Sequence, residues 1–468
     1  MQRPDLASNV HYQHVLNAFR GSHYSARAVY DLVLPIFVDT VFMALVEFCN
    51  TGIISSDGPA SVGAVNTANA VHWLMFGTFN SIALGTCVLV AQHFGAGHRE
   101  QIGRVTAAAV HGMLAVTVVY SALVLAFEDQ VITLLFGAAQ PDVFANIRVF
   151  LFGLLVSYPL RGFYTAVAGA LRGIGRTKVT LALSVVANGS NMVLNVAFVM
   201  GLHMGVAGLA WSVVISQVLG AAMGVRLLRA YSTELHVTRA MLLHVDARRI
   251  GTVLSVSLPF ILEDLFFNGG KLIIQMFIVP FGTLQLAANG IIGSWVHLIE
   301  IVPRTLCTAI VPIAGASLGA RDVAYARKIT RTFIITGSLV SAVMGLALAA
   351  VFPWALTSFY HADPATYGIL WMLMWMNVVA YPLLFSAQSV LPGMLRAAGD
   401  GKWTTICSLS SMWIYRIGLG YFVSVTLNYQ IVGLWAVWLT EWGVRTLLFY
   451  LRYRTGRWAQ HDLVGRDA

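Results

Sequence analysis

The sequence predicts an all-α membrane protein with twelve transmembrane helices in two six-helix lobes related by a parallel repeat. Of the 468 residues, 58% are hydrophobic and only 10% are charged, whereas a soluble domain carries about 25% charged residues. Apolar stretches of about 20 residues recur along nearly the whole chain, and each is long enough to cross a bilayer as a helix. The third observation is an internal repeat, in which the second half of the chain matches the first at a constant offset.

The spans are expected to be helices, because unsatisfied backbone groups exclude coils and open sheet edges from lipid. The first thirty residues are polar and lack the apolar core of a cleavable signal peptide, so the first span is expected to act as its own insertion signal. The predicted spans lie near 28–51, 62–92, 105–127, 146–170, 179–200, 206–230, 250–279, 285–315, 329–352, 367–392, 403–426 and 431–451.

Basic residues gather in alternate loops, and this pattern predicts the topology. Arg172, Arg176 and Lys178 share one such loop, whereas the connections 201–205 and 353–366 contain neither Lys nor Arg. Cytoplasmic loops of membrane proteins carry this excess of Lys and Arg, so both termini are expected in the cytoplasm, with the chain in the inner (cytoplasmic) membrane. The same pattern accounts for the net charge of +9 without a nucleic-acid partner.

The repeat is visible without gaps and divides the chain. Pro35 matches Pro259, and the pair Gly95-Ala96 matches Gly319-Ala320. Six spans per copy is an even number, so both copies enter the membrane in the same direction, as in the parallel repeats of many transporters. The predicted parts are a cytoplasmic N-terminal segment 1–27, an N-lobe 28–230, a cytoplasmic inter-lobe loop 231–249, a C-lobe 250–458 and a cytoplasmic tail 459–468.

Two runs at equivalent positions carry a family resemblance. Leu-Arg-Gly-Ile-Gly-Arg-Thr-Lys at 171–178 and Leu-Arg-Ala-Ala-Gly-Asp-Gly-Lys at 395–402 resemble the signature loop of the multidrug and toxic-compound extrusion (MATE) family. The stretch from Glu263 to Gly270-Lys271 resembles a bacterial branch with a Gly-Lys pair in span seven. The resemblance implies two six-helix lobes with a central cavity. It also implies export of small cationic or amphipathic compounds on a proton or sodium gradient by a chain that acts as a monomer.

Charged residues inside the spans are candidates for the transport site, because each costs about 2.5–3.5 kcal/mol at the bilayer centre. The first span carries Asp39, Glu47 and Asn50 on one helix face. The repeat places Glu263 at the position of Asp39 and Lys271 at that of Glu47. For Lys271 a partner from another helix is expected. Glu300 and Glu441 are the candidates on other helices, and a structural pair with Asp264 of the same span is the alternative.

The resemblance also exposes a departure from the family. In well-studied branches an aspartate stands at each of the positions that align here with Asn50 and Asn195, and Asn191 lies one turn before the latter. Asparagine cannot release a proton. Two interpretations stay open: Asp39 and Glu47 couple transport to the ion gradient, or Glu263 in the second lobe does.

The tenth, eleventh and twelfth spans contain further candidate residues whose sequence patterns are less specific. Trp375 and Asn377 lie in a Trp- and Met-rich span, where rings attract cations and Met adapts to varied shapes, although ordinary helix packing explains such residues equally well. Arg416 lies in span eleven. Glu441 stands four residues before Arg445, a spacing that favours a structural ion pair on one helix.

Several functions lack their motifs. There is no phosphate-binding Gly-rich loop followed by Lys-Ser/Thr, so direct use of ATP is not expected. The four cysteines lie in apolar segments without paired spacing, and neither a metal site, a cofactor nor a catalytic residue is predicted. The sequence therefore predicts a secondary antiporter rather than an enzyme, coupled to H⁺ or Na⁺. The alternative is a flippase for lipid-linked or polyisoprenoid substrates.

Overall fold

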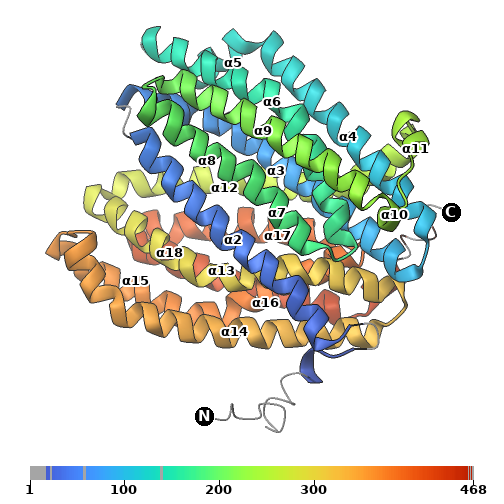
Figure 1. Cartoon of the computed structure of the whole chain (residues 1–468). Helices are drawn as coiled ribbons and strands as arrows, with labels where there is room; N and C mark the ends of the chain where they lie inside the picture. Colours follow the sequence, from blue (N-terminus) through green and yellow to red (C-terminus); the bar gives the residue numbers. More distant parts are fainter. Residues whose placement is uncertain are drawn as a thin grey trace, which may run out of the picture. The chain divides into compact units, whose positions relative to one another are not determined.

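The computed structural model describes residues 17–21, 24–55, 59–136, 141–461, 463 and 465. These residues form helices joined by short turns, and no strand occurs among them (Figure 1). The long helices are α2 (Ala26–Ser55), α3 (Pro59–Ala96), α4 (Arg99–Ala126), α6 (Pro141–Gly173), α9 (Gly205–Ala230), α12 (Ala247–Ile278), α13 (Thr283–Gly319), α14 (Val323–Trp354) and α18 (Gln430–Arg454).

Three further segments run as helices with π-helical turns inside them. The first consists of α7 (Thr177–Ser184), η2 (Val185–Gly189), α8 (Ser190–Asn195) and η3 (Val196–Gly201). The second consists of α15 (Tyr367–Ala380), η7 (Tyr381–Phe385) and α16 (Ser386–Ala397). The third consists of α17 (Gly401–Ser410), η8 (Ser411–Leu419) and η9 (Phe422–Thr426). All twelve predicted spans are thus helical, which confirms the predicted fold class.

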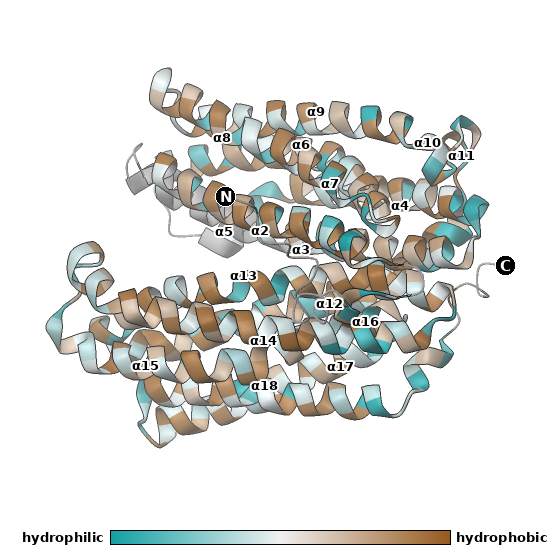
Figure 2. Ribbon diagram, turned by 60° about the horizontal axis from the view of Figure 1, so that its bottom comes forward, coloured by the Kyte–Doolittle hydropathy of each residue, from teal (hydrophilic) through white to brown (hydrophobic). Residues whose placement is uncertain are grey.

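Ten helices within the described part of the chain are long and apolar enough to cross a membrane. The last two predicted spans, 403–426 and 431–451, do not meet that measure, because polar residues interrupt the first and Glu441 and Arg445 lie in the second. Apolar side chains also face outward. Hydrophobic residues predominate along α14 in Figure 2. Leu339, Val343 and Leu346 of this helix lie on one face and are more than half exposed, as expected for a surface in lipid.

The contacts divide the chain into two compact units, which are described separately. Of the described residues, the N-terminal unit holds those within 34–261 and residue 465, and the C-terminal unit holds those within 17–33 and 262–463. The division falls inside α2 and α12. Residues 17–21 lie with the C-terminal unit because α14 holds them: Lys328 Nζ donates to the carbonyls of Asn17 at 2.7 Å and Arg20 at 2.9 Å.

Within the N-terminal unit, α6 packs against α3, α4 and α9 through small residues. A Cβ atom at Gly169 would lie 2.6 Å from the carbonyl oxygen of Ala83, so the crossing of α6 and α3 requires glycine. The C-terminal unit repeats this contact at the equivalent positions, where Gly393 of α16 meets Cys307 of α13. A Cβ atom at Gly393 would lie 2.9 Å from the Cys307 carbonyl oxygen. The repeat therefore preserves a close helix crossing in each unit.

One irregularity separates the two copies. The dipeptide Tyr158-Pro159 returns as Tyr381-Pro382, one position earlier than the offset between Arg172 and Arg396 requires. The extra residue of the second copy is accommodated by the π-helical turn η7, while α6 passes the equivalent point as a regular helix. A π-turn is a one-residue insertion in a helix. The insertion turns Tyr381 relative to the helix that follows it.

The predicted inter-lobe loop 231–249 is not free of structure. It contains the short helices α10 (Ser232–Leu235) and α11 (Arg239–Leu243), and Leu235 is fully buried. Glu234 pairs with Arg176 at 2.7 Å, and this hydrogen bond raises the pKa of Arg176. The loop prediction missed these turns because each is too short to show a helical period. A further helix, α5 (Glu128–Phe136), was not predicted either.

Candidate transport site

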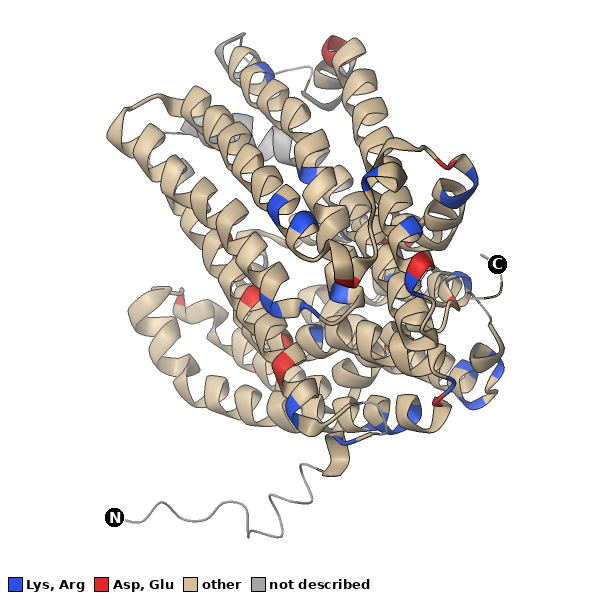
Figure 3. Cartoon of the chain, turned by 45° about the vertical axis from the view of Figure 1, so that its right-hand side comes forward, with Lys and Arg blue, Asp and Glu red and all other residues tan. Residues whose placement is uncertain are grey.

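Charged side chains are sparse along the helices, so those inside the spans can be followed one by one (Figure 3). In the N-terminal unit, Asp39 of α2 lies 3.8 Å from Arg172 at the end of α6. In the C-terminal unit, Glu263 of α12 lies 2.7 Å from Arg396 at the end of α16. The two acids occupy equivalent positions of the repeat, and so do the two arginines. The same ion pair therefore occurs twice.

The sequence pointed to both acids and to both arginine loops, but not to their pairing. Each pair joins the first span of its copy to the loop after the fourth, so no local pattern connects its members. Glu263 is largely buried, with a side chain 12% exposed. Asp39 is similarly enclosed, at 19%. Glu47, by contrast, is exposed on α2 and lies outside this pair.

The asparagines of the N-terminal unit form a neutral network. Asn195 of α8 donates to Asn50 of α2 at 3.0 Å and to Asn191 at 3.2 Å. Ser212 of α9 in turn donates to the side-chain oxygen of Asn195. The three predicted residues therefore do meet, and α9 supplies a fourth that the sequence did not indicate. None of the four can carry a charge, so this network can bind a substrate or hold helices together but cannot exchange protons.

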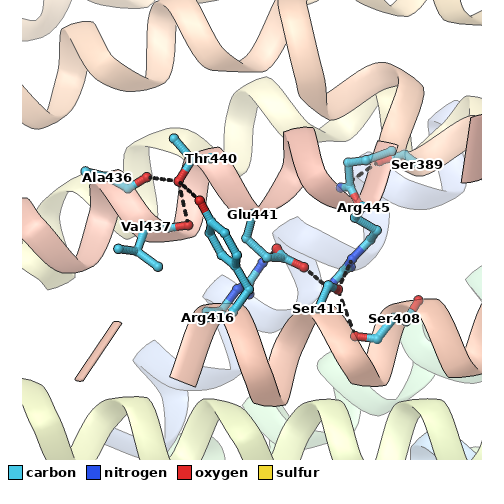
Figure 4. A network of polar contacts seen from close by, with 11 residues as sticks. Ser389, Ser408, Ser411, Arg416, Ala436, Val437, Thr440, Glu441 and Arg445 are labelled. Carbon is cyan, nitrogen blue, oxygen red and sulfur yellow. Dashed lines mark hydrogen bonds and ion pairs between the residues drawn. The ribbon is translucent and has the colours of Figure 1, made fainter. Parts of the chain in front are cut away.

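The largest buried charge cluster lies in the C-terminal unit, and Figure 4 shows it. Glu441 of α18 is completely buried and pairs with Arg445 at 2.6 Å on its own helix and with Arg416 of η8. Ser411 accepts a hydrogen bond from Arg445 Nε at 3.1 Å. The Glu441–Arg445 spacing on one helix was predicted. The second arginine was not, because it comes from the neighbouring helix.

A second cluster surrounds Glu300 of α13. Its carboxylate pairs with Arg304 at 2.5 Å, accepts a hydrogen bond from the Tyr381 hydroxyl at 2.8 Å and lies 3.4 Å from His297 Nδ1. Arg304, Tyr381 and His297 were not among the predicted residues. The repeated Tyr-Pro dipeptide was the signal that could have found Tyr381, since its copy Tyr158 also meets a titratable side chain, His72 Nδ1, at 3.2 Å.

The expected partner of Lys271 needs correction. None of the described carboxylates forms an ion pair with Lys271, because Glu300 and Glu441 are held by arginines. Asp264 accepts a hydrogen bond from Asn268 at 3.1 Å. The Lys271 ammonium lies over the ring of Phe267 instead, 5.2 Å from its centroid. Lys271 is nevertheless exposed.

The two residues predicted in the tenth span do not join these clusters. Trp375 is exposed on the outer face of α15. Asn377 is buried, and its amide donates to the carbonyl of Leu373 on the same helix at 2.8 Å. The structure thus supports the ordinary packing interpretation for Asn377. The four cysteines are all unpaired, and the described residues contain no group of three or more His, Cys, Asp or Glu suited to a metal ion.

A polytopic helical protein with polar clusters inside both halves of an internal repeat has the architecture of a membrane transporter. The MatE family model matches residues 35–197 and again 259–422, so the two matches begin at the equivalent prolines Pro35 and Pro259. The chain belongs to the MATE family of multi-pass membrane transporters, which is not a family of enzymes.

Known proteins similar to this chain cover nearly its whole length. The uncharacterized transporter YisQ of Bacillus subtilis is 24% identical over 444 residues, covering 93% of this chain and 96% of YisQ. A probable multidrug resistance protein NorM of Chromobacterium violaceum is 24% identical over 444 residues, covering 91% and 93%. The crystal structure of a MATE protein in a straight conformation has a TM-score of 0.83 at 19% identity, covering 93% and 97%.

Proposed function

We propose that this chain is a secondary antiporter that exports small amphipathic organic compounds, organic cations among them, in exchange for protons or sodium. Support comes from the family and from carboxylates held inside spans that would otherwise be apolar. Buried carboxylates suit antiport, because burial favours the neutral form and lets proton uptake compete with binding of a cation. No phosphate-binding loop for ATP occurs in the sequence.

The C-terminal unit is the proposed place of ion coupling. Its interior holds three acids, Glu263, Glu300 and Glu441, whereas the network around Asn195 in the N-terminal unit is neutral. Glu300 and Glu441 are each bound by an arginine on their own helix, four residues further on. Glu263 differs because its arginine comes from the end of another helix, α16. A helix movement could therefore separate Glu263 from Arg396 and release the acid for an ion.

The central test is whether a gradient drives efflux. The purified chain is reconstituted into proteoliposomes, a fluorescent amphipathic compound is loaded, and a pH or sodium gradient is imposed separately. Dependence of efflux on one of the two gradients is the expected result and identifies the coupling ion. Efflux that responds to neither gradient contradicts antiport.

A pair of variants then locates the coupling. Glu263→Gln is expected to fold and bind compound yet lose gradient-driven efflux, since the amide keeps the shape but cannot bind a proton or compete for a cation. Asp39→Asn is the matched change in the other copy of the ion pair, and it is expected to retain most of the efflux. Wild-type rates in Glu263→Gln would rule out this carboxylate as the coupling group.

The same proposal covers the membrane in which the chain lies, its orientation there and the extent of its lobes. We propose that it lies in the cytoplasmic membrane with both termini in the cytoplasm, following its basic loops. It is proposed to act as a monomer, since the repeat supplies two lobes within one chain. The lobes are proposed to extend over residues 28–230 and 250–458. Cysteines introduced near 203 and 361 lie in loops proposed to face away from the cytoplasm, and cysteines near 176 and 400 lie in loops proposed to face it. Comparing the accessibility of the two sets tests the orientation.

A further inference from the structure

An unusual gathering of positive charge surrounds Phe267 of α12. Its ring lies 5.2 Å from the Lys271 ammonium, 5.2 Å from the guanidinium carbon of Arg445 and 5.4 Å from that of Arg416. Three cations from three helical segments of the C-terminal unit thus meet at one ring. Cation–π contacts offset part of the cost of placing charge there, but they do not neutralise it.

The acids of this region make contacts with residues other than Lys271. Glu441 is shared between Arg416 and Arg445, so that group alone retains one positive charge. Glu300 pairs with Arg304, whereas Asp264 accepts a hydrogen bond from the neutral amide of Asn268, which leaves the charge of the carboxylate in place. Lys271 forms no ion pair with any described residue, as noted above. The four cations Lys271, Arg304, Arg416 and Arg445 therefore outnumber the three acids Asp264, Glu300 and Glu441 of this region by one.

The cations also differ in how far a ligand can reach them. Arg416 and Arg445 are buried, with side chains 2% and 8% exposed. Lys271 is exposed, and the Arg304 side chain is 58% exposed. Arg304 uses Nε and one amino group for Glu300, and a guanidinium has further N–H donors.

We propose that Lys271, together with Arg416 and Arg445 at the same ring, forms a binding site for the anionic group, in the first place a carboxylate, of the transported compound. Lys271 is the accessible cation of the three at Phe267, and the two buried arginines at the same ring add to its attraction for a carboxylate. Charge-assisted hydrogen bonds to a carboxylate are among the strong ones, and more so away from bulk water. The inference deepens the proposed function, and its transport part rests on that function. It narrows the substrate class from amphipathic compounds to carboxylates and zwitterions.

A matched pair of dyes tests the site. A rhodamine with a free carboxylate and the methyl ester of the same dye differ only in the anionic group. Binding to the purified protein in nanodiscs of phosphatidylcholine is followed by fluorescence polarisation. Wild type is expected to bind the carboxylate dye at least about tenfold more tightly than the ester, and Lys271→Met is expected to abolish that preference. Lys271→Arg is expected to retain it.

Controls distinguish binding at the proposed site from effects of general positive charge and of anionic lipid. Lys402→Met removes one exposed positive charge outside the cluster and is expected to leave the preference intact. The proposal is overturned if wild type binds the ester more tightly, or if Lys271→Met loses affinity equally for both dyes. It is also overturned if phosphatidylglycerol in the nanodisc displaces the carboxylate dye from wild type and Lys271→Met alike. Because binding is measured without a gradient, failure of antiport in the vesicle assay leaves this test intact.

Discussion

The two units share a scaffold but differ in what they bury. Gly169 and Gly393 make the same helix crossing, and the ion pairs of Asp39 and Glu263 with their arginines repeat in both. At the next equivalent positions the units diverge. Gln217 stands where the second copy has Glu441, and Phe76 where it has Glu300. The ring of Phe76 lies under Arg161, 4.9 Å from the guanidinium, whereas Glu300 forms an ion pair with Arg304.

This difference indicates which contacts serve the architecture and which serve one unit alone. A contact that both copies make at equivalent positions is needed to assemble either half. A charge that only one copy buries carries a cost that packing alone does not require. The charged clusters around Glu300 and Glu441 therefore distinguish the C-terminal unit from the N-terminal unit, while Glu263, whose ion pair belongs to the shared scaffold, is the carboxylate proposed to couple transport to the ion.

The largest expected effect comes from the centre of the larger cluster. Glu441→Ala leaves two buried arginines without an acid and is expected to lower the free energy of unfolding by about 3–5 kcal/mol. The equivalent change Gln217→Ala removes a neutral acceptor from the Tyr164 hydroxyl, now 2.7 Å away, and is expected to cost about 1–3 kcal/mol. Thermal unfolding in detergent measures both. Equal losses would contradict the contrast between the units.

The repeated tyrosines offer a second comparison. Tyr381→Phe removes a buried hydrogen bond to the Glu300 carboxylate and is expected to cost about 1.5–3 kcal/mol, because bonds to charged groups are the stronger ones. Tyr158→Phe removes the contact with His72 and is expected to cost about 0.5–1.5 kcal/mol. The same unfolding assay ranks them. If Tyr158→Phe proved the more harmful, the N-terminal unit would hold a charged site that the neutral description misses.

The repeated glycines test what the units have in common. Gly169→Ala and Gly393→Ala are each expected to lower stability by about 1–3 kcal/mol through overpacking. Gly169→Ala is expected to be the more severe, because its nearest neighbour is the Ala83 backbone, whereas Gly393 first meets the side chain of Ile310. Gly251→Ala is the control, since a Cβ atom there meets nothing within 4 Å. A Gly251→Ala protein as destabilised as the other two would contradict crowding as the cause.

The smallest effect concerns the start of α12, the helix that leads from one unit into the other. The hydrogen bond from the Arg249 backbone, together with the Arg249 charge, lowers the pKa of Asp246 below its usual 3.8. The ionised acid is therefore favoured in the folded state. Its stabilising contribution is complete above the unfolded pKa of 3.8 and is lost as the pH falls below it.

Hydrogen exchange of the first amides of α12 measures this effect. Protection factors are expected to fall as the pH is lowered through the region below 3.8 in wild type, and to fall less in Asp246→Asn, which caps the helix without titrating. Identical pH dependence in both proteins would assign the loss to another group.

Part of the transport site could be read from residue types and the repeat. The constant offset of the repeat identified Asp39 and Glu263 as twins, and the spacing of Glu441 and Arg445 predicted their pair. The sequence did not predict correctly which side chains from other helices would be the partners. Lys271 was expected to meet an acid, yet Glu300 is held by Arg304 one turn along its own helix, and that pair needs no second cation.

The sequence by itself determined the helical membrane fold, the two copies and the types of residue available to each, because hydropathy, glycine and proline act locally and survive in the pattern. Only the tertiary structure decided which of these residues meet. A side chain reaches a few ångströms, and the rotation and depth of each helix decide what lies there. A one-residue π-turn before α16 is enough to alter them. The repeated acid–arginine pairs, the neutral asparagine network and the position of Lys271, which forms no ion pair with a described carboxylate, all depend on that geometry.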